Sequence, residues 1–242
     1  MLAARGDLAA AEKEMREAWE FGKAHGVAWS FVSWLMLAEY AYNRGDMAAA
    51  ERYCSDPSGT EPKTYMAGSV DSTRFSLFAR SGDDRAAEAW ANRSWKLPIA
   101  GQVNSLGSWS ALGNSVIGLA SLGRKEEAAS LWPLTKELLL TGAWLIRSAL
   151  LCRTVAGIAA ASAGDWAASE EHHRTAIYQA DTAPYKNLQP VAREWYAAML
   201  LDRNSPGDAD KGRAPLQDAI TKYESLGMTY PAKLASKKLS AL

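Results

Sequence analysis

Gly45-Asp46-Met47-Ala48-Ala49-Ala50 is a short stretch whose pattern recurs along this chain of 242 residues. Its glycine recurs at spacings of 37 to 43 residues, at Gly6, Gly45, Gly82, Gly123, Gly164 and Gly207. Aspartate follows the glycine in every copy except one, where Arg124 stands instead. The residue five places after the glycine is always small: Ala11, Ala50, Ala87, Ala128, Ser169 and Gly212. Repeats of about 40 residues are typical of stacked helical hairpins.

Each part of the repeated stretch has a physical role in such a hairpin. Glycine adopts the left-handed conformation that ends a helix, without the steric penalty of a Cβ atom. The aspartate can cap the next helix and suits the positive end of its dipole. The small residue lets the second helix cross closely over the first. The sequence therefore predicts units of helix, tight turn and helix, and stacking buries faces that one unit alone leaves exposed.

We predict an all-α fold, an α-α superhelix of five to six helical hairpins that spans residues 1–242 as one repeat domain. The predicted helices are 7–23, 28–43 with 46–54, 63–80 with 83–95, 105–122 with 124–140, 143–163 with 165–179, and 188–201 with 209–226. A capping helix is predicted at 231–242. The breaker-rich residues 55–65 predict an irregular loop.

The repeat resembles the tetratricopeptide repeat (TPR) superfamily at further positions. Twelve places after the glycine, Ala18, Ala176 and Ala219 fit the family pattern, Ser94 and Thr135 fit it imperfectly, and Pro57 breaks it. The repeat is also longer than the family's usual length of about 34 residues. The resemblance implies a right-handed TPR-like superhelix.

The last part of the chain carries a more specific resemblance. Residues 214–220 (APLQDAI), 223–228 (YESLGM) and 232–235 (AKLA) resemble the C-terminal repeat region of bacterial ATPase-linked transcriptional activators and nucleotide cyclases. This resemblance implies a sensor or scaffold in signal transduction or transcription regulation, without ATPase, cyclase or DNA-binding segments here. Because the first predicted helical turn begins abruptly at Met1, we expect a fragment of a larger protein, or a short gene product that lost upstream domains.

Composition and charge narrow the class of partner. The 27 basic and 27 acidic residues give no basic surplus, which argues against a nucleic-acid face and against anionic membranes. The apolar stretch 143–163 contains Arg147 and Arg153, which favours a buried helix over a membrane span. We expect a cytoplasmic protein, since no signal peptide is visible. Cys54 and Cys152 indicate small core residues in a reducing compartment, with a single disulfide as the alternative.

Two stretches resemble metal sites without completing one. Glu170-Glu171-His172-His173 contains the Glu-x-x-His spacing of di-iron bundles, but no second copy accompanies it, which favours a solvated helix face. Asp83, Asp84 and Glu88 resemble an acidic magnesium cluster, although helix capping already explains Asp83. Gly-rich phosphate loops, nucleophile elbows and zinc-ligand clusters do not occur in the sequence. We therefore expect no cofactor, no metal and no enzymatic activity.

Polar residues on otherwise apolar helices are the candidate binding residues. The groove positions of the TPR family lie on the first helix of each pair, and counting back from the glycines places them as a set. That set is Glu39, Asn43, Ser72, Ser76, Arg80, Ser110, Ser121 and Thr154. They are either binding residues or simply exposed groove residues. We expect the groove to bind a protein or peptide, or a small-molecule effector.

Two other function classes stay open. One is an enzyme on an α/α helical scaffold, for which a deep pocket lined by several carboxylates or a bound metal would be the sign. The other is self-association as a homodimer through the N-terminal end, which carries no polar cap comparable with the C-terminal helix.

Overall fold

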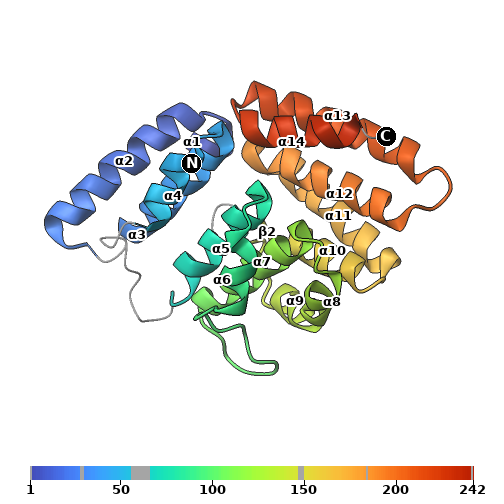
Figure 1. Ribbon diagram of the computed structural model, residues 1–242, viewed down its shortest axis with the longest axis horizontal. Helices are drawn as coiled ribbons and strands as arrows, with labels where there is room; N and C mark the ends of the chain where they lie inside the picture. Colours follow the sequence, from blue (N-terminus) through green and yellow to red (C-terminus); the bar gives the residue numbers. More distant parts are fainter. Residues whose placement is uncertain (1, 28–29, 56–65, 147–149, 184, 241) are drawn as a thin grey trace. The chain divides into compact units, whose positions relative to one another are not determined.

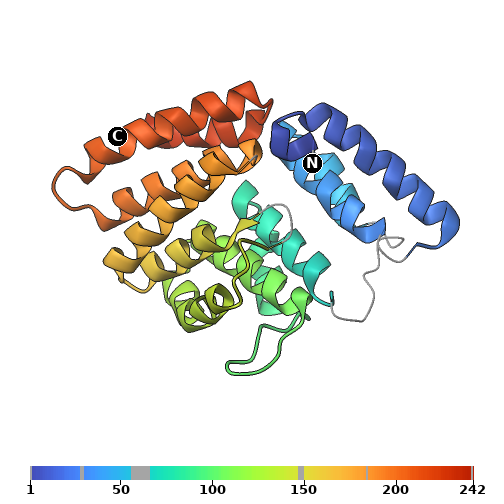
Figure 2. The ribbon, with the colours of Figure 1, turned by 180° about the vertical axis from the view of Figure 1, so that it is seen from behind.

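The computed structural model describes residues 2–27, 30–55, 66–146, 150–183, 185–240 and 242, and helices dominate these residues (Figures 1 and 2). This confirms the all-α class. The chain forms two compact units, the N-terminal unit Leu8–Arg124 and the C-terminal unit Met1–Asp7 with Lys125–Leu242. Most of the loop predicted at 55–65 lies outside the described residues.

The N-terminal unit consists of helical hairpins that pack around tryptophans. Its helices are α2 (Leu8–His25), α3 (Ser30–Arg44), α4 (Met47–Ser55), α5 (Ser69–Ser81), α6 (Arg85–Ala91) and α7 (Leu106–Ser121). α2 packs on α3, α3 on α4, and α5 on both α6 and α7, while α5 also contacts α3 and α4. Trp19 and Trp34 stack with ring centroids 6.4 Å apart and anchor the core of the first hairpins.

The C-terminal unit continues the same construction. It contains α1 (Leu2–Arg5), α8 (Lys125–Ser130), α9 (Trp132–Leu140), β1 (Leu145–Ile146), β2 (Leu150–Leu151), α10 (Cys152–Ser162), α11 (Trp166–Thr182), the 3-10 helix η2 (Lys186–Leu188), α12 (Gln189–Arg203), α13 (Asp208–Ser225) and α14 (Thr229–Leu239). From α10 to α14, each helix packs on the next, as the yellow-to-red ribbons of Figure 1 show. Short turns join these helices, which makes successive helices neighbours in space.

The six repeated glycines form the predicted turns. Their φ angles lie between 71° and 91°, in the left-handed region that glycine enters without a Cβ clash. Several of the aspartates accept a hydrogen bond from an amide of the next helix, among them Asp46 from Ala49, Asp83 from Arg85 and Asp165 from Ala168. Asp208 differs, because it accepts the amide of Ser205 on its own turn.

The small residue after the turn is buried in five of the six copies. Ser169 shows why the position must be small, since its hydroxyl lies 2.7 Å from the carbonyl oxygen of Gly157 on the facing helix. The exception is the third copy, where Ala87 is exposed and Ala86 is fully buried instead. There α6 begins at Arg85, and the buried face is shifted by one residue.

Four predicted helices differ from the observed ones. The helix predicted at 63–80 begins only at Ser69, after a turn over residues 66–68. The helix predicted at 124–140 is divided into α8 and α9, because Pro133 lacks an amide hydrogen and its ring clashes with the carbonyl four residues earlier. The helix predicted at 143–163 begins only at Cys152, and β1 pairs antiparallel with β2 before it. The helix predicted at 83–95 ends at Ala91, and the non-helical residues after it place the Trp95 ring 5.7 Å from that of Phe75.

The structure bears on two expectations, one about a disulfide and one about a membrane span. Cys54 and Cys152 are both free and buried, which agrees with small core residues rather than with the disulfide alternative. None of the helices in the described part of the chain has the length and apolar character that crossing a membrane requires.

Candidate functional site

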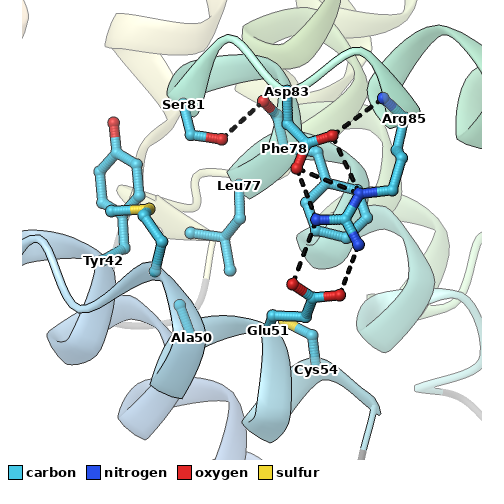
Figure 3. Close-up of a pocket in the computed structure, with 10 residues that line it drawn as sticks. Tyr42, Ala50, Glu51, Cys54, Leu77, Phe78, Ser81, Asp83 and Arg85 are labelled. Atoms are coloured by element: carbon cyan, nitrogen blue, oxygen red, sulfur yellow. Dashed lines mark hydrogen bonds and ion pairs between the residues drawn. The ribbon is translucent and has the colours of Figure 1, made fainter.

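A small cavity opens in the N-terminal unit where two successive hairpins meet (Figure 3). Its walls come from the end of α3, from α4, from the end of α5, and from the turn that leads into α6. The cavity measures about 40 Å³, within about 340 Å³ of space between the lining side chains that includes open solvent. This is less than the 300–1,000 Å³ of a typical small-molecule site, and it suits a single side chain.

One side of the cavity is apolar because of helical spacing. Met47, Ala50 and Cys54 recur at intervals of three and four residues, so they share one face of α4. Leu77 of α5 and Tyr42 of α3 complete this wall. Ala50 is also the small residue of its repeat, and its lack of a longer side chain helps to leave the space open.

The other side of the cavity is a charged clamp. The guanidinium of Arg85 lies between two carboxylates, with Nε 3.0 Å from Asp83 Oδ1 and Nη2 3.1 Å from Glu51 Oε2 (Figure 3). It also lies 4.5 Å from the centre of the Phe78 ring, a cation–π distance. Hydrogen bonds from Arg85 hold the pKa of both carboxyls below their ordinary values. Two carboxylates face one guanidinium, so the clamp has one surplus negative charge.

The clamp belongs to a regularity in the repeat. The residue six places after the turn glycine is acidic in several copies, and among the described residues Glu12, Glu51 and Glu170 each pair with an arginine near the next turn glycine. The pairs are Glu12 with Arg44, Glu51 with Arg85, and Glu170 with Arg203. Each pair joins one hairpin to the following one within the same unit. The acidic residues at this position can be read from the sequence, but which arginine pairs with each of them depends on where each helix begins.

Among the described residues, Glu12 and Glu170 each pair with a second arginine, whereas Glu51 pairs with Arg85. Four residues further along the same helix, Arg16 lies 2.8 Å from Glu12, and Arg174 lies 2.6 Å from Glu170. The residue four places after Glu51 is Ser55. The side chain of Glu51 is 44% exposed, compared with 15% for Glu12 and 24% for Glu170.

Cys54 lines the cavity without the properties of a nucleophile. Burial raises the pKa of its thiol to about 12, so the thiol stays protonated at neutral pH. Its backbone carbonyl accepts a hydrogen bond of 2.9 Å from Nε of Arg74 on α5, which joins the end of α4 to the next hairpin. The cysteine is therefore a packing residue of the cavity wall.

Of the predicted groove residues, Glu39 and Arg80 are brought together. Nη2 of Arg80 lies 2.8 Å from each carboxylate oxygen of Glu39, and the guanidinium lies 4.3 Å from the centre of the Tyr42 ring. Tyr42 also lines the cavity, so this pair flanks the candidate site. Asn43 is half-buried and Ser121 is exposed.

The expected exposure of four groove residues is wrong. Ser72, Ser76, Ser110 and Thr154 are at most 2% exposed. The α5–α7 interface is lined with small polar residues, and Asn114 donates hydrogen bonds of 3.1 Å to the hydroxyls of Ser72 and Thr73 there. Helix α7 thus covers the face of α5 that we expected to be open as part of the groove. Sequence reasoning also missed Tyr42, Met47, Leu77 and Phe78, whose apolar character resembles that of any core residue.

The two metal-like stretches do not gather ligands. Within the described residues, no group of three or more histidine, cysteine, aspartate or glutamate side chains could hold a metal ion. Glu170 is bound by Arg203 and Arg174, and His173 is fully buried. His172 is also buried, which corrects the expectation that this stretch is a solvated helix face. Asp83 belongs to the Arg85 clamp.

The sequence and the structure were compared with known proteins. No protein-family model matches the chain, and searches of curated proteins and of solved structures found no match.

Proposed function

We propose that this protein is a non-enzymatic binding scaffold with a TPR-like superhelix, and that it takes a side chain of a protein or peptide segment into the cavity beside Glu51 and Arg85. The observation that carries the proposal is the cavity itself, which has an apolar wall on one side and exposed charged groups on the other. Binding sites commonly combine apolar walls with a few polar groups that fix orientation.

The size of the cavity favours a segment over a free small molecule. A space of about 40 Å³ cannot enclose most of a drug-sized ligand, but it can hold the end of one anchor side chain. Anchor residues that fill such pockets supply much of the energy of protein–protein binding. The rest of the segment would lie across the exposed surface of α4 and α6.

The biological setting follows from the sequence resemblance. The TPR-like repeat and the C-terminal stretches support a sensor or scaffold role in a bacterial signalling protein or transcriptional regulator of the cytoplasm. The balanced charge supports a protein partner rather than nucleic acid or an anionic membrane.

Selection from a random peptide library on the full chain tests this proposal. We expect some enriched peptides to bind the wild type and to lose binding when Ala50→Phe fills the cavity. The matched control is Ala48→Phe, which adds the same ring at an exposed position of the same helix. Circular dichroism of both variants establishes that the helices are intact, and Ala50→Leu provides a milder filling if Ala50→Phe unfolds. Peptides that bind all variants equally well would refute the cavity as the binding site.

A further inference from the structure

We propose that the side chain taken by this cavity is cationic, a lysine or arginine of the partner, and that Glu51 binds its charge. This inference rests on the proposed function, because it names the chemistry of the ligand at the same site. It is carried by the comparison of Glu51 with the equivalent residues of the other repeats.

Glu12 and Glu170 occupy the same position of the repeat as Glu51, and each of them pairs with two arginines. Each is bound by one arginine near the next turn and by a second arginine four residues along its own helix. Within the part of the chain that the structure describes, Glu51 is bound by the first cation, Arg85, and Ser55 occupies the position of the second arginine. A cation supplied by a partner would complete the same arrangement.

Hydrogen-bonding capacity leads to the same conclusion. An ionised carboxylate offers about four acceptor positions. The two oxygens of Asp83 accept four contacts from Arg85, including that from its backbone amide. Among the described residues, Glu51 accepts two contacts, one on each oxygen and both from Arg85. Its carboxylate therefore has room for further donors. A cation therefore has an exposed acceptor to bind.

The opposite wall suits the rest of such a side chain. Lysine and arginine carry an aliphatic stem that packs on apolar surface while the charged end stays in a polar environment. Met47, Ala50 and Leu77 provide apolar surface beside Glu51. An anionic side chain would meet the surplus negative charge of the clamp, and a neutral one would leave that charge unmatched.

Small probes of matched length test the preference directly. We would titrate the full chain with n-butylammonium, n-propylguanidinium, 1-butanol and butyrate, and follow the methyl signal of Met47 by NMR, assigned with Met47→Leu. We expect the two cations to bind about fivefold more tightly than 1-butanol at low salt, as for a partly exposed ion pair, and butyrate to bind most weakly.

Two substitutions locate the preference at Glu51. Glu51→Gln keeps the shape of the side chain and should remove the preference for cations. Ser55→Arg supplies the missing arginine within the chain, and it should also remove the preference while 1-butanol binds as before. Glu88→Gln, which removes an exposed acid from α6, and Ser55→Gln are the matched controls and should change nothing.

The outcomes separate this inference from the proposed function. Equal binding of 1-butanol and the cations, tighter binding of butyrate, or a cation preference that survives both Glu51→Gln and Ser55→Arg would overturn the cationic ligand. The peptide selection could then still identify an apolar anchor. If no probe shifts the Met47 signal at about 100 mM, binding is weaker than expected even for ligands of about five to seven heavy atoms, and the cationic ligand is likewise overturned. In that case the peptide selection alone decides the proposed function.

Discussion

Acidification from pH 7 to pH 5 is predicted to destabilise the C-terminal unit by about 2 kcal/mol, through a buried histidine. His173 of α11 is fully buried, and neither ring nitrogen has a hydrogen-bond partner among the described residues. Its ring packs against Gly157 of α10, where a Cβ atom would lie 2.7 Å from Nε2. Protonation would therefore place an unpaired charge between the two helices.

The magnitude follows from the pKa of His173 in the two states. Burial, with a smaller effect of His172, lowers the pKa of His173 from 6.5 to about 3. A histidine with a lowered folded pKa contributes stability that is complete above pH 6.5 and is lost as the pH falls toward 3. Each pH unit in this window changes the free energy of unfolding by about 1.4 kcal/mol, so the step from 6.5 to 5 costs about 2 kcal/mol.

His172 acts in the same direction. Its Nδ1 lies 2.8 Å from Nη1 of Arg153, and because arginine can only donate, Nδ1 must accept and the ring must be neutral. Burial and then the charge of Arg153 lower the pKa of His172. The carboxyls of Glu170 and Asp208 have pKa values lowered by Arg203, so they stay ionised above pH 5 and do not contribute in this window.

Hydrogen exchange measured by mass spectrometry at pH 7 and pH 5 is the suitable assay, because it resolves α10 and α11 within the full chain. We expect the opening free energy of these helices to fall by about 2 kcal/mol or slightly more. His173→Gln should remove most of this difference, whatever its effect at pH 7, and His25→Gln at an exposed position should not. Equal opening energies at both pH values, or an undiminished difference in His173→Gln, would show that protonation of His173 does not destabilise these helices.

Three further predictions concern packing and pairing, and each is checked by urea unfolding of the full chain. Gly157→Ala should destabilise the protein by about 1–3 kcal/mol because its methyl group overlaps the His173 ring. Gly212→Ala, with its nearest neighbours at 3.6 Å or more, should stabilise the protein by about 0.5–1 kcal/mol. Equal effects of the two substitutions would show that the contact with His173 does not determine the cost. Asn114→Ala should cost about 1–3 kcal/mol, since it removes the donor that Ser72 and Thr73 share, and Asn104→Ala in an exposed loop should cost less. Arg80→Ala should cost about 1–2 kcal/mol because Glu39 is only 14% exposed, and Arg80→Lys should recover part of it; no loss in Arg80→Ala would show that the pair adds no stability.

The hairpin turns could be predicted from the sequence because their cause is local. A positive φ angle is a property of one residue, and glycine followed by aspartate specifies both the end of one helix and the start of the next. The helix break at Pro133 was equally local, and its signal was present in the sequence. The strand pair β1–β2 was not recognisable, because an apolar run as short as this suits either a strand or a buried helix.

The binding residues could not be predicted in the same way. Counting positions back from each glycine assumes that every first helix leaves the same face open, whereas α7 covers that face of α5. In the third copy, the buried alanine is also displaced by one residue from the repeat. Counting along the sequence therefore selected serines that are buried. The exposed charged residues of the site, Glu51 and Arg85, are recognised from the helix packing.

The repeat nevertheless explains why the cavity lies where it does. Ala50 is small because two helices cross there, and the same small side chain leaves space beside Glu51. Asp83 accepts the amide of Arg85 at the start of α6, and the same carboxylate fixes the Arg85 guanidinium opposite Glu51. Residues that form the hairpins thus also form the site. A change of one residue, an arginine at position 55, would make this junction equivalent to those at Glu12 and Glu170, and for that reason the Ser55→Arg variant separates a binding role for Glu51 from a purely structural one.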